Sequence, residues 1–305
     1  MATGLRIGIN GTGELSSVDR AVEVARRAEA DGFDTYWAAQ IFGLDALTTL
    51  ALVGREVPRI ELGTAVVPTF PRHPMALAGQ ALTTQLASGD RLALGIGLSH
   101  RIVVEDLWGY SYDHPVRHMR EYLDALLPLL RGEPVDVHGE DVTCVGAVDI
   151  QGAAAPPTLV AALGAQMLRL AGSRGCGTIT WCTGERTLAE HIVPRITAAA
   201  DEARHARPRV VASLPVAVTD DVDAARAVVA DQLALYGGLP SYRAMLDLEG
   251  ADGPADVALL GDEATIEAAL GRLADGGVTD FAAAITAGSR EEHDRTWSLL
   301  RQLQG

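Results

Sequence analysis

Short apolar runs alternate with amphipathic stretches along almost the whole chain. The apolar runs are rich in β-branched and aliphatic residues and predict strands, whereas the stretches between them repeat their apolar positions at helical spacing. We expect strands at 5–10, 34–40, 60–67, 91–98, 158–164, 178–183, 209–218 and 280–286. We expect helices at about 18–31, 46–56, 74–88, 113–130, 165–173, 187–204, 221–235, 241–248, 262–275 and 290–303.

This alternation predicts an α/β protein with a parallel sheet, and eight strand–helix units suit a closed (β/α)8 TIM barrel. We expect one domain over 1–305, with an insertion after strand four at about 101–150 that includes a hairpin at 134–150. An open doubly wound sheet is the alternative. Its signature would be the glycines of 8–13, but these do not form GxGxxG, and Asp34 opens strand two rather than ending it.

The stretch 59–100 organises the predicted site. It reads as strand, loop, helix and strand, with Gly63 on strand three and with Gly95 and Gly97 on strand four. Neighbouring parallel strands would bring this bare main chain to the same end of the sheet, where a flat ring could lie against it. Alternatively, the glycines only make room for packing.

Charge and composition exclude several classes of function. The net charge is −15, which disfavours nucleic acid and anionic membranes as partners. All 25 basic residues are arginine, so Schiff-base chemistry, a Walker-A loop and a lysine general base are excluded. We see no apolar stretch long enough to span a membrane and no signal peptide. The 3 cysteines form no CxxC pair, and we expect them to be reduced in a cytoplasmic protein.

Several short motifs, in order along the chain, resemble the bacterial luciferase-like superfamily, and more closely its coenzyme F420-dependent oxidoreductase branch. They are GFDTYW (32–37), RIELGTAV (59–66), RHPMALA (72–78), GDRLALGIG (89–97), RHMREYL (117–123), PPTLVAA (156–162) and GDEATI (261–266). The resemblance implies a TIM barrel with an insertion, often dimeric, that binds a deazaflavin or FMN at the C-terminal mouth. We therefore expect F420 as the cofactor, with FMN as the alternative, and a homodimer.

The resemblance also implies roles for matching residues. The pair after Gly63 and Thr64 would form a bulge with a non-prolyl cis peptide behind the ring, and the loop after strand four would line the ring and tail. The start of the helix after strand five would receive a phosphate, which suits a chain without lysine. Gln40 would meet the edge of the ring. The expected cofactor-binding residues are Gln40, Gly63, Thr64, Ala65, Val66, Gly97, Leu98, Ser99, Ala162, Leu163, Gly164, Ala165, Thr183 and Gly184.

The chain departs from the sugar-phosphate dehydrogenases of that branch. Their Asp-His pair after strand two is replaced by Gln40 and Ile41, their strand-four glutamate is matched by His100, and their phosphate-binding lysines are absent. This argues against a sugar phosphate and towards a neutral, apolar acceptor. His100 is the candidate catalytic residue, because an imidazole can donate a proton near neutral pH; alternatively it orients the ring. The expected substrate pocket consists of Phe42, Trp108 and Tyr110.

These expectations favour an F420H2-dependent reductase that transfers a hydride to an activated C=C or C=N of a small or peptide substrate. An FMN-dependent luciferase-like monooxygenase and a non-catalytic barrel that serves as a partner subunit are the alternatives. We expect no metal. His114 and His118 have the spacing of metal ligands on a helix, but we interpret them as part of a solvated helix start.

Overall fold

The computed structural model describes residues 4–11, 16–40 and 42–304, so Ile41 and the end of the 8–13 glycine motif lie outside it. Within these residues, eight parallel strands pair in the order β12-β1-β2-β3-β5-β8-β9-β10, and β10 pairs back to β12, which closes a barrel. This confirms the predicted (β/α)8 class and rules out the open sheet. The barrel strands are β1 (Arg6–Asn10), β2 (Thr35–Ala38), β3 (Glu61–Thr64), β5 (Leu92–Gly97), β8 (Thr158–Val160), β9 (Gly177–Trp181), β10 (Val210–Val218) and β12 (Asp280–Ile285).

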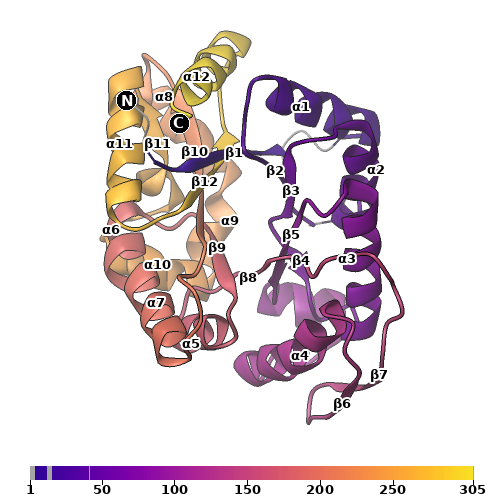
Figure 1. Cartoon of the computed structure of the whole chain (residues 1–305). Coiled ribbons are helices and arrows are strands. Elements are labelled where there is room, and N and C mark those ends of the chain that lie inside the picture. The colour runs from indigo at the N-terminus through magenta and orange to yellow at the C-terminus, as the bar shows by residue number, and fades with distance from the viewer. Residues whose placement is uncertain (1–3, 12–15, 41, 305) are drawn as a thin grey trace.

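Helices surround this barrel on its outside (Figure 1). Several begin where the sequence offers a cap: Ser17, Asp45 and Asp262 each accept a hydrogen bond from a backbone N–H of the first turn. The outer helices are α1 (Val18–Ala30), α2 (Ala46–Glu56), α3 (Pro74–Ser88), α4 (Pro115–Leu130), α5 (Ala165–Ser173), α6 (Glu185–Thr187), α7 (Val193–Glu202), α11 (Glu263–Asp275) and α12 (Arg290–Gln302). The π-helical turn Leu188–Ile192 joins α6 to α7.

Strand three is not continuous as predicted. It divides into β3 and the short β4 (Val67–Pro68), and the two residues between them, Ala65 and Val66, are joined by a cis peptide bond. The predicted strands at 34–40 and 158–164 likewise end earlier, at Ala38 and Val160. The residues that a strand pattern assigned to these ends belong to loops at the C-terminal mouth.

The N-terminal end of the barrel is closed by an ion-pair cluster. Arg209 at the start of β10 contacts Glu61 at 2.7 Å and Asp280 at 2.6 Å, and Arg6 contacts the same Glu61 at 2.9 Å. Above this cluster, Trp37 fills the barrel interior and is completely buried. The closed end leaves only the opposite end of the barrel available for a ligand.

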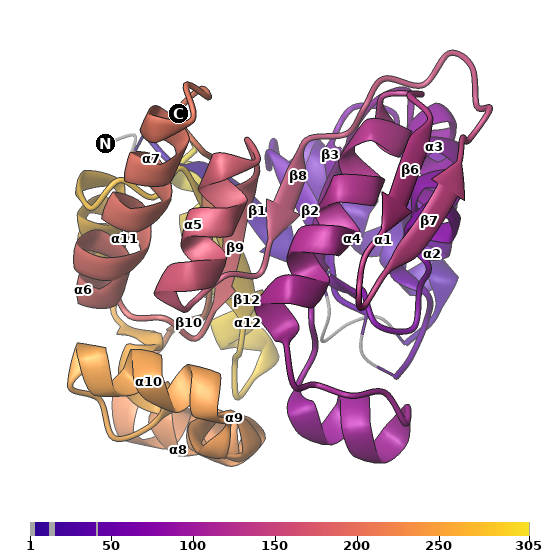
Figure 2. The same cartoon turned by 90° about the horizontal axis from the view of Figure 1, so that it is seen from below.

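Two excursions of the chain extend past the C-terminal mouth. One is residues 98–114, which include the π-helical turn Val103–Leu107. The other contains α8 (Val222–Gln232), α9 (Ala234–Gly238) and α10 (Pro240–Glu249), followed by the turn Pro254–Val257 and β11 (Leu259–Gly261). Figure 2 shows both at the lower edge of the view, on either side of the barrel axis.

Within the predicted insertion at 101–150, α4 contacts both α3 and α5 and is therefore the fourth outer helix of the barrel. The predicted hairpin is present as β6 (Val135–His138) and β7 (Thr143–Gly146). Across the described ranges, no helix is both long and apolar enough to cross a membrane.

Candidate active site

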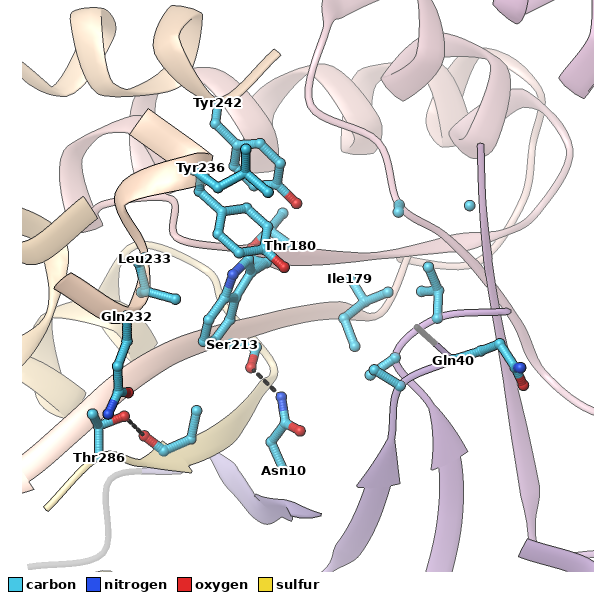
Figure 3. Close-up of a pocket in the computed structure, with 18 of the residues that line it drawn as sticks. Asn10, Gln40, Ile179, Thr180, Ser213, Gln232, Leu233, Tyr236, Tyr242 and Thr286 are labelled. Carbon is cyan, nitrogen blue, oxygen red and sulfur yellow. Dashed lines mark hydrogen bonds between the residues drawn. The ribbon is translucent and has the colours of Figure 1, made fainter. Parts of the chain in front are cut away.

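A large cavity opens at the C-terminal mouth, where barrel active sites lie (Figure 3). Its volume is about 1440 Å³, which is ample for a cofactor together with a substrate. Loops after most of the barrel strands contribute to its lining, and the cavity also reaches outward between α1 and α12.

The floor of the cavity is formed by the cis-linked pair Ala65 and Val66, which pack against the cluster inside the barrel. The expected cis peptide is present at this pair. Gly97 lies beside it: a Cβ added at Gly97 would lie only 2.7 Å from the Cγ2 atom of Val66. A flat surface of small side chains and main chain therefore faces the cavity here.

The other two glycines of the organising stretch serve packing instead. A Cβ on Gly63 would overlap the indole ring of Trp37, and one on Gly95 would overlap the carbonyl oxygen of Thr64. The hydroxyl of Thr64 donates to the Gly95 carbonyl at 2.7 Å and accepts from the Gly95 N–H at 2.8 Å. Packing therefore explains Gly63 and Gly95, which do not line the cavity. Gly97 does line it, and so fits the other explanation, bare main chain against which a flat ring could lie.

The structure brings most of the expected cofactor-binding residues together. Those that line the cavity are Gln40, Ala65, Val66, Gly97, Leu98, Ser99, Leu163 and Gly164. Those that do not line it are Gly63, Thr64, Ala162, Ala165, Thr183 and Gly184. Ala165 nevertheless directly follows Gly164 and opens α5, so its backbone N–H is at the cavity's edge.

Two helix starts near the mouth differ in what they can accept. The first N–H groups of α5 have no partner within the helix, and its N-cap Gly164 provides no side chain to satisfy them. At α6, by contrast, the Glu249 carboxylate already accepts from the N–H of Thr187 at 2.7 Å and of Arg186 at 3.2 Å. An anionic group can therefore be held at α5, whereas Glu249 holds the place beside Gly184.

Gln40 is only partly available to a ligand. Its side-chain oxygen accepts a hydrogen bond from the N–H of Ala46, at the start of α2, at 2.7 Å. Its own backbone N–H donates to the carbonyl of Val66 at 3.1 Å and so supports the cis-linked pair. The amide NH2 is the part of Gln40 that remains for a cofactor.

His100 lies in the cavity wall directly after Ser99, which has a positive φ of 65°. Its ring centroid is 5.7 Å from that of Tyr242 and 6.1 Å from that of Tyr236. Burial lowers the pKa of His100 below its ordinary value, so the neutral imidazole predominates at pH 7. Its carbonyl accepts hydrogen bonds from the N–H groups of Val103 and Val104, so the imidazole is the part of His100 that is available to a substrate.

Two of the three expected substrate-pocket residues line the cavity. Phe42 does so although its side chain is 67% exposed, and Trp108 does so from the end of the π-helical turn. Tyr110 lies outside the lining, with its ring centroid 6.3 Å from that of Phe70.

The histidine pair fits the predicted solvated helix start only in part, because His114 is exposed at the N-cap of α4 whereas His118 is not. His118 is buried, stacks on Phe70 with ring centroids 4.0 Å apart, and pairs its Nε2 atom with the hydroxyl of Thr69 at 3.1 Å. In the part of the chain that the structure describes, no cluster of three or more potential metal ligands occurs.

Sequence reasoning missed the opposite wall of the cavity. It is formed by Trp181 at the end of β9 and by two tyrosines from the excursion after β10. Figure 3 shows these tyrosines, Tyr236 and Tyr242. Asn10, the last residue of β1, and Ser213, within β10, also line the cavity, and the side-chain amide of Asn10 donates to the hydroxyl of Ser213 at 3.1 Å. The rule that barrel sites use strand ends would have indicated Trp181, but no pattern singles out the two tyrosines.

Fold and site together define a (β/α)8 barrel protein with a large cavity at the C-terminal mouth. Comparison with known proteins makes this class specific: the family model of the luciferase-like monooxygenases matches residues 3–296, and the chain belongs to that family.

Individual relatives agree with this assignment. The 5,10-methylenetetrahydromethanopterin reductase of Methanolobus tindarius is 29% identical over 260 residues, which cover 84% of this chain and 78% of that protein. Among solved structures, the coenzyme F420-dependent tetrahydromethanopterin reductase of Methanopyrus kandleri superposes with a TM-score of 0.81 at 20% identity, covering 98% of both chains. The oxygenating constituent of 3,6-diketocamphane monooxygenase from Pseudomonas putida, in complex with FMN, superposes with a TM-score of 0.75 at 17% identity, covering 100% of this chain and 97% of that one.

Proposed function

We propose that this protein is an F420H2-dependent reductase that transfers a hydride to an activated C=C or C=N bond of a small or peptide substrate. The observation that carries the proposal is the flat floor at Ala65, Val66 and Gly97, which faces a cavity large enough for a deazaflavin and a second molecule. Relatives named as F420-dependent, a putative oxidoreductase of Mycobacterium tuberculosis and a glucose-6-phosphate dehydrogenase of Mycolicibacterium gilvum, support the deazaflavin rather than FMN.

The residues present fit such a cofactor. The ring system would lie on the cis-linked pair, with Gly97 leaving space at its side and the NH2 group of Gln40 near its edge. The anionic tail would reach the N–H groups that begin α5, next to Gly164, which the helix and its N-cap side chain do not satisfy. When bound, the reduced deazaflavin supplies the hydride.

The chain's own contribution is to position the acceptor and to provide a proton. The lining beside the floor is mainly apolar and aromatic, and His100 is the titratable group within it that we assign as the proton donor, directly or through water. Lacking lysine, the chain has no amine with which to hold a substrate phosphate, so the substrate we propose is neutral.

An assay of turnover tests the proposal. Purified protein is mixed with F420H2 and a panel of enones and imines without oxygen, and the return of oxidised F420 is followed by its fluorescence. Acceptor-dependent oxidation of F420H2 is the expected result. Oxygen uptake with FMNH2 in place of F420H2 would instead favour the monooxygenase alternative. No binding of either cofactor would favour the non-catalytic partner subunit.

We also propose that the chain forms a homodimer, as members of this branch often do. Light scattering of the purified protein measures this directly, and a monomer mass at micromolar concentration would contradict it.

A further inference from the structure

Four rings form an aromatic box along one side of the cavity: Trp181, Tyr236, Tyr242 and His100. The Tyr236 and Tyr242 rings meet edge to face, with centroids 5.1 Å apart and planes at 86°. Trp181 approaches Tyr236 at 6.2 Å and 73°, and His100 approaches Tyr242 at 5.7 Å. Such an arrangement presents ring faces and edges to a third planar group, which is a geometry that aromatic systems favour.

The two tyrosines of the box carry unused hydrogen-bond donors. Among the described residues, neither phenol oxygen of Tyr236 or Tyr242 has a hydrogen-bond partner, and Figure 3 shows both turned toward the interior of the cavity. Burial raises the pKa of both phenols, so each keeps its proton at neutral pH. An O–H that faces a cavity and has no protein partner is available to donate to an acceptor atom that a ligand brings to it.

The box itself contains no acidic side chain. Cations are held in aromatic cages mainly through the ring faces, but two inward O–H donors favour an acceptor atom over a cation. An anionic ligand would find no unpaired positive charge in the box, because the imidazole of His100 is predominantly neutral at pH 7. A neutral, planar group that bears an acceptor oxygen matches this set of contacts.

We propose that the aromatic box is the acceptor subsite, and that it selects a conjugated carbonyl compound whose planar system lies among the rings and whose carbonyl oxygen accepts from Tyr236 or Tyr242. This rests on the proposed function and names its substrate class. In the reduction, the β-carbon of the enone receives the hydride from F420H2 and the C=C electron pair moves toward the carbonyl oxygen. A proton then adds at the α-carbon, and the two electrons of the reduction would come from bound F420H2, which would be oxidised to F420. The tyrosine O–H stabilises the negative charge that develops on the oxygen.

A matched pair of probes tests the subsite without the cofactor. One is 4-phenyl-3-buten-2-one, and the other is its analogue 3-methyl-1-phenyl-1,3-butadiene, in which a methylene group replaces the carbonyl oxygen. Binding of each to the full chain is measured by ligand-observed NMR titration. The expected result is that the ketone binds about tenfold more tightly than the diene, as one buried hydrogen bond provides.

The variants Tyr236→Phe, Tyr242→Phe and the double variant remove the hydroxyls while keeping the rings. The double variant should bring the ketone-to-diene affinity ratio close to one and lower kcat/KM for the ketone with F420H2, with the affinity for F420 unchanged. The control is Tyr122→Phe, which removes a hydroxyl that donates to the Arg72 carbonyl at 2.9 Å and lies outside the cavity lining. It should leave the ratio as in the wild type.

Three results would overturn the subsite: a ratio near one in the wild type, a ratio that survives the double substitution, or tighter binding of tetramethylammonium than of the ketone. Failure of the protein to bind F420 would refute the proposed function, but the ketone-to-diene affinity ratio, which is measured without cofactor, would still test the subsite. If the protein binds F420 but the ketone-to-diene affinity ratio is one, only the proposed subsite is refuted.

Discussion

Substituting Gly97 by alanine perturbs the cavity floor by a single methyl group. Gly97 has no positive φ, so its backbone tolerates alanine, and the effect comes from contacts alone. The new Cβ would lie 2.7 Å from the Cγ2 atom of Val66 and 3.2 Å from the Cβ atom of Ala161, whereas carbon atoms pack best at about 3.5–4.0 Å. Val66 would therefore have to shift, in a floor that a ring is proposed to cover.

Overpacking of this kind costs about 1–3 kcal/mol. At about 1.4 kcal/mol per tenfold change, this corresponds to roughly a 5- to 150-fold weaker affinity for F420 if the shifted Val66 side chain stands in the ring's place. Fluorescence titration of F420 with wild type and variant measures the ratio, and thermal unfolding shows that the variant is folded.

The matched control is Gly79→Ala on α3, where an added Cβ meets no atom within 4 Å. It should leave F420 affinity unchanged and, as a helix-interior substitution, raise the unfolding free energy by up to about 1 kcal/mol. A folded Gly97→Ala variant that binds F420 as tightly as the wild type would refute the assignment of the floor.

Three further predictions concern the barrel and its titratable groups. Gly63→Ala places a methyl group in the ring of buried Trp37 and should lower the unfolding free energy by about 1–3 kcal/mol in urea denaturation. Burial alone would raise the pKa of Glu61, but Arg209 outweighs burial and lowers that pKa below 4.5. The carboxylate therefore stabilises the fold above pH 4.5, and this stabilisation is lost as the pH falls through the lowered pKa. The variant Glu61→Gln should have a lower unfolding free energy than the wild type at pH 7 and should lose less of it on acidification. Burial lowers the pKa of His100 below 6.5, so the protonated form that donates a proton decreases as the pH rises through this lowered pKa. The kcat/KM for F420H2 oxidation should therefore fall over the same pH range. The variant His100→Gln should abolish this pH dependence, and a variant with the wild-type pH profile would assign the proton to water.

The alternation of apolar runs was enough to predict the barrel, because the barrel strands are largely buried on both faces and the longer outer helices each bury an apolar stripe. It could not predict where strands end. Ala65 and Val66 have the composition of a strand, but they leave the sheet at the cis bond, and the residues after Val160 turn toward the mouth. Such endings are decided by tertiary contacts that a local pattern does not contain.

The site could be predicted only in part, because local sequence patterns do not contain the tertiary contacts that complete it. Residues adjacent to strand ends, such as Gly97 and His100, could be assigned to the mouth from the barrel topology and the family resemblance. Gly63 carries the same local signal as Gly97, yet it faces Trp37, because only the register of β2 against β3 decides which glycine meets a side chain. Tyr236 and Tyr242 enter the cavity through an excursion whose path no sequence pattern specifies.

The most direct test of the central claim is an equilibrium titration of the wild-type protein with oxidised F420 and, separately, with FMN, each followed by quenching of the ligand's fluorescence. The account predicts saturable binding of one F420 per chain at micromolar concentration, tighter than that of FMN. Absence of F420 binding, or tighter binding of FMN, would contradict it.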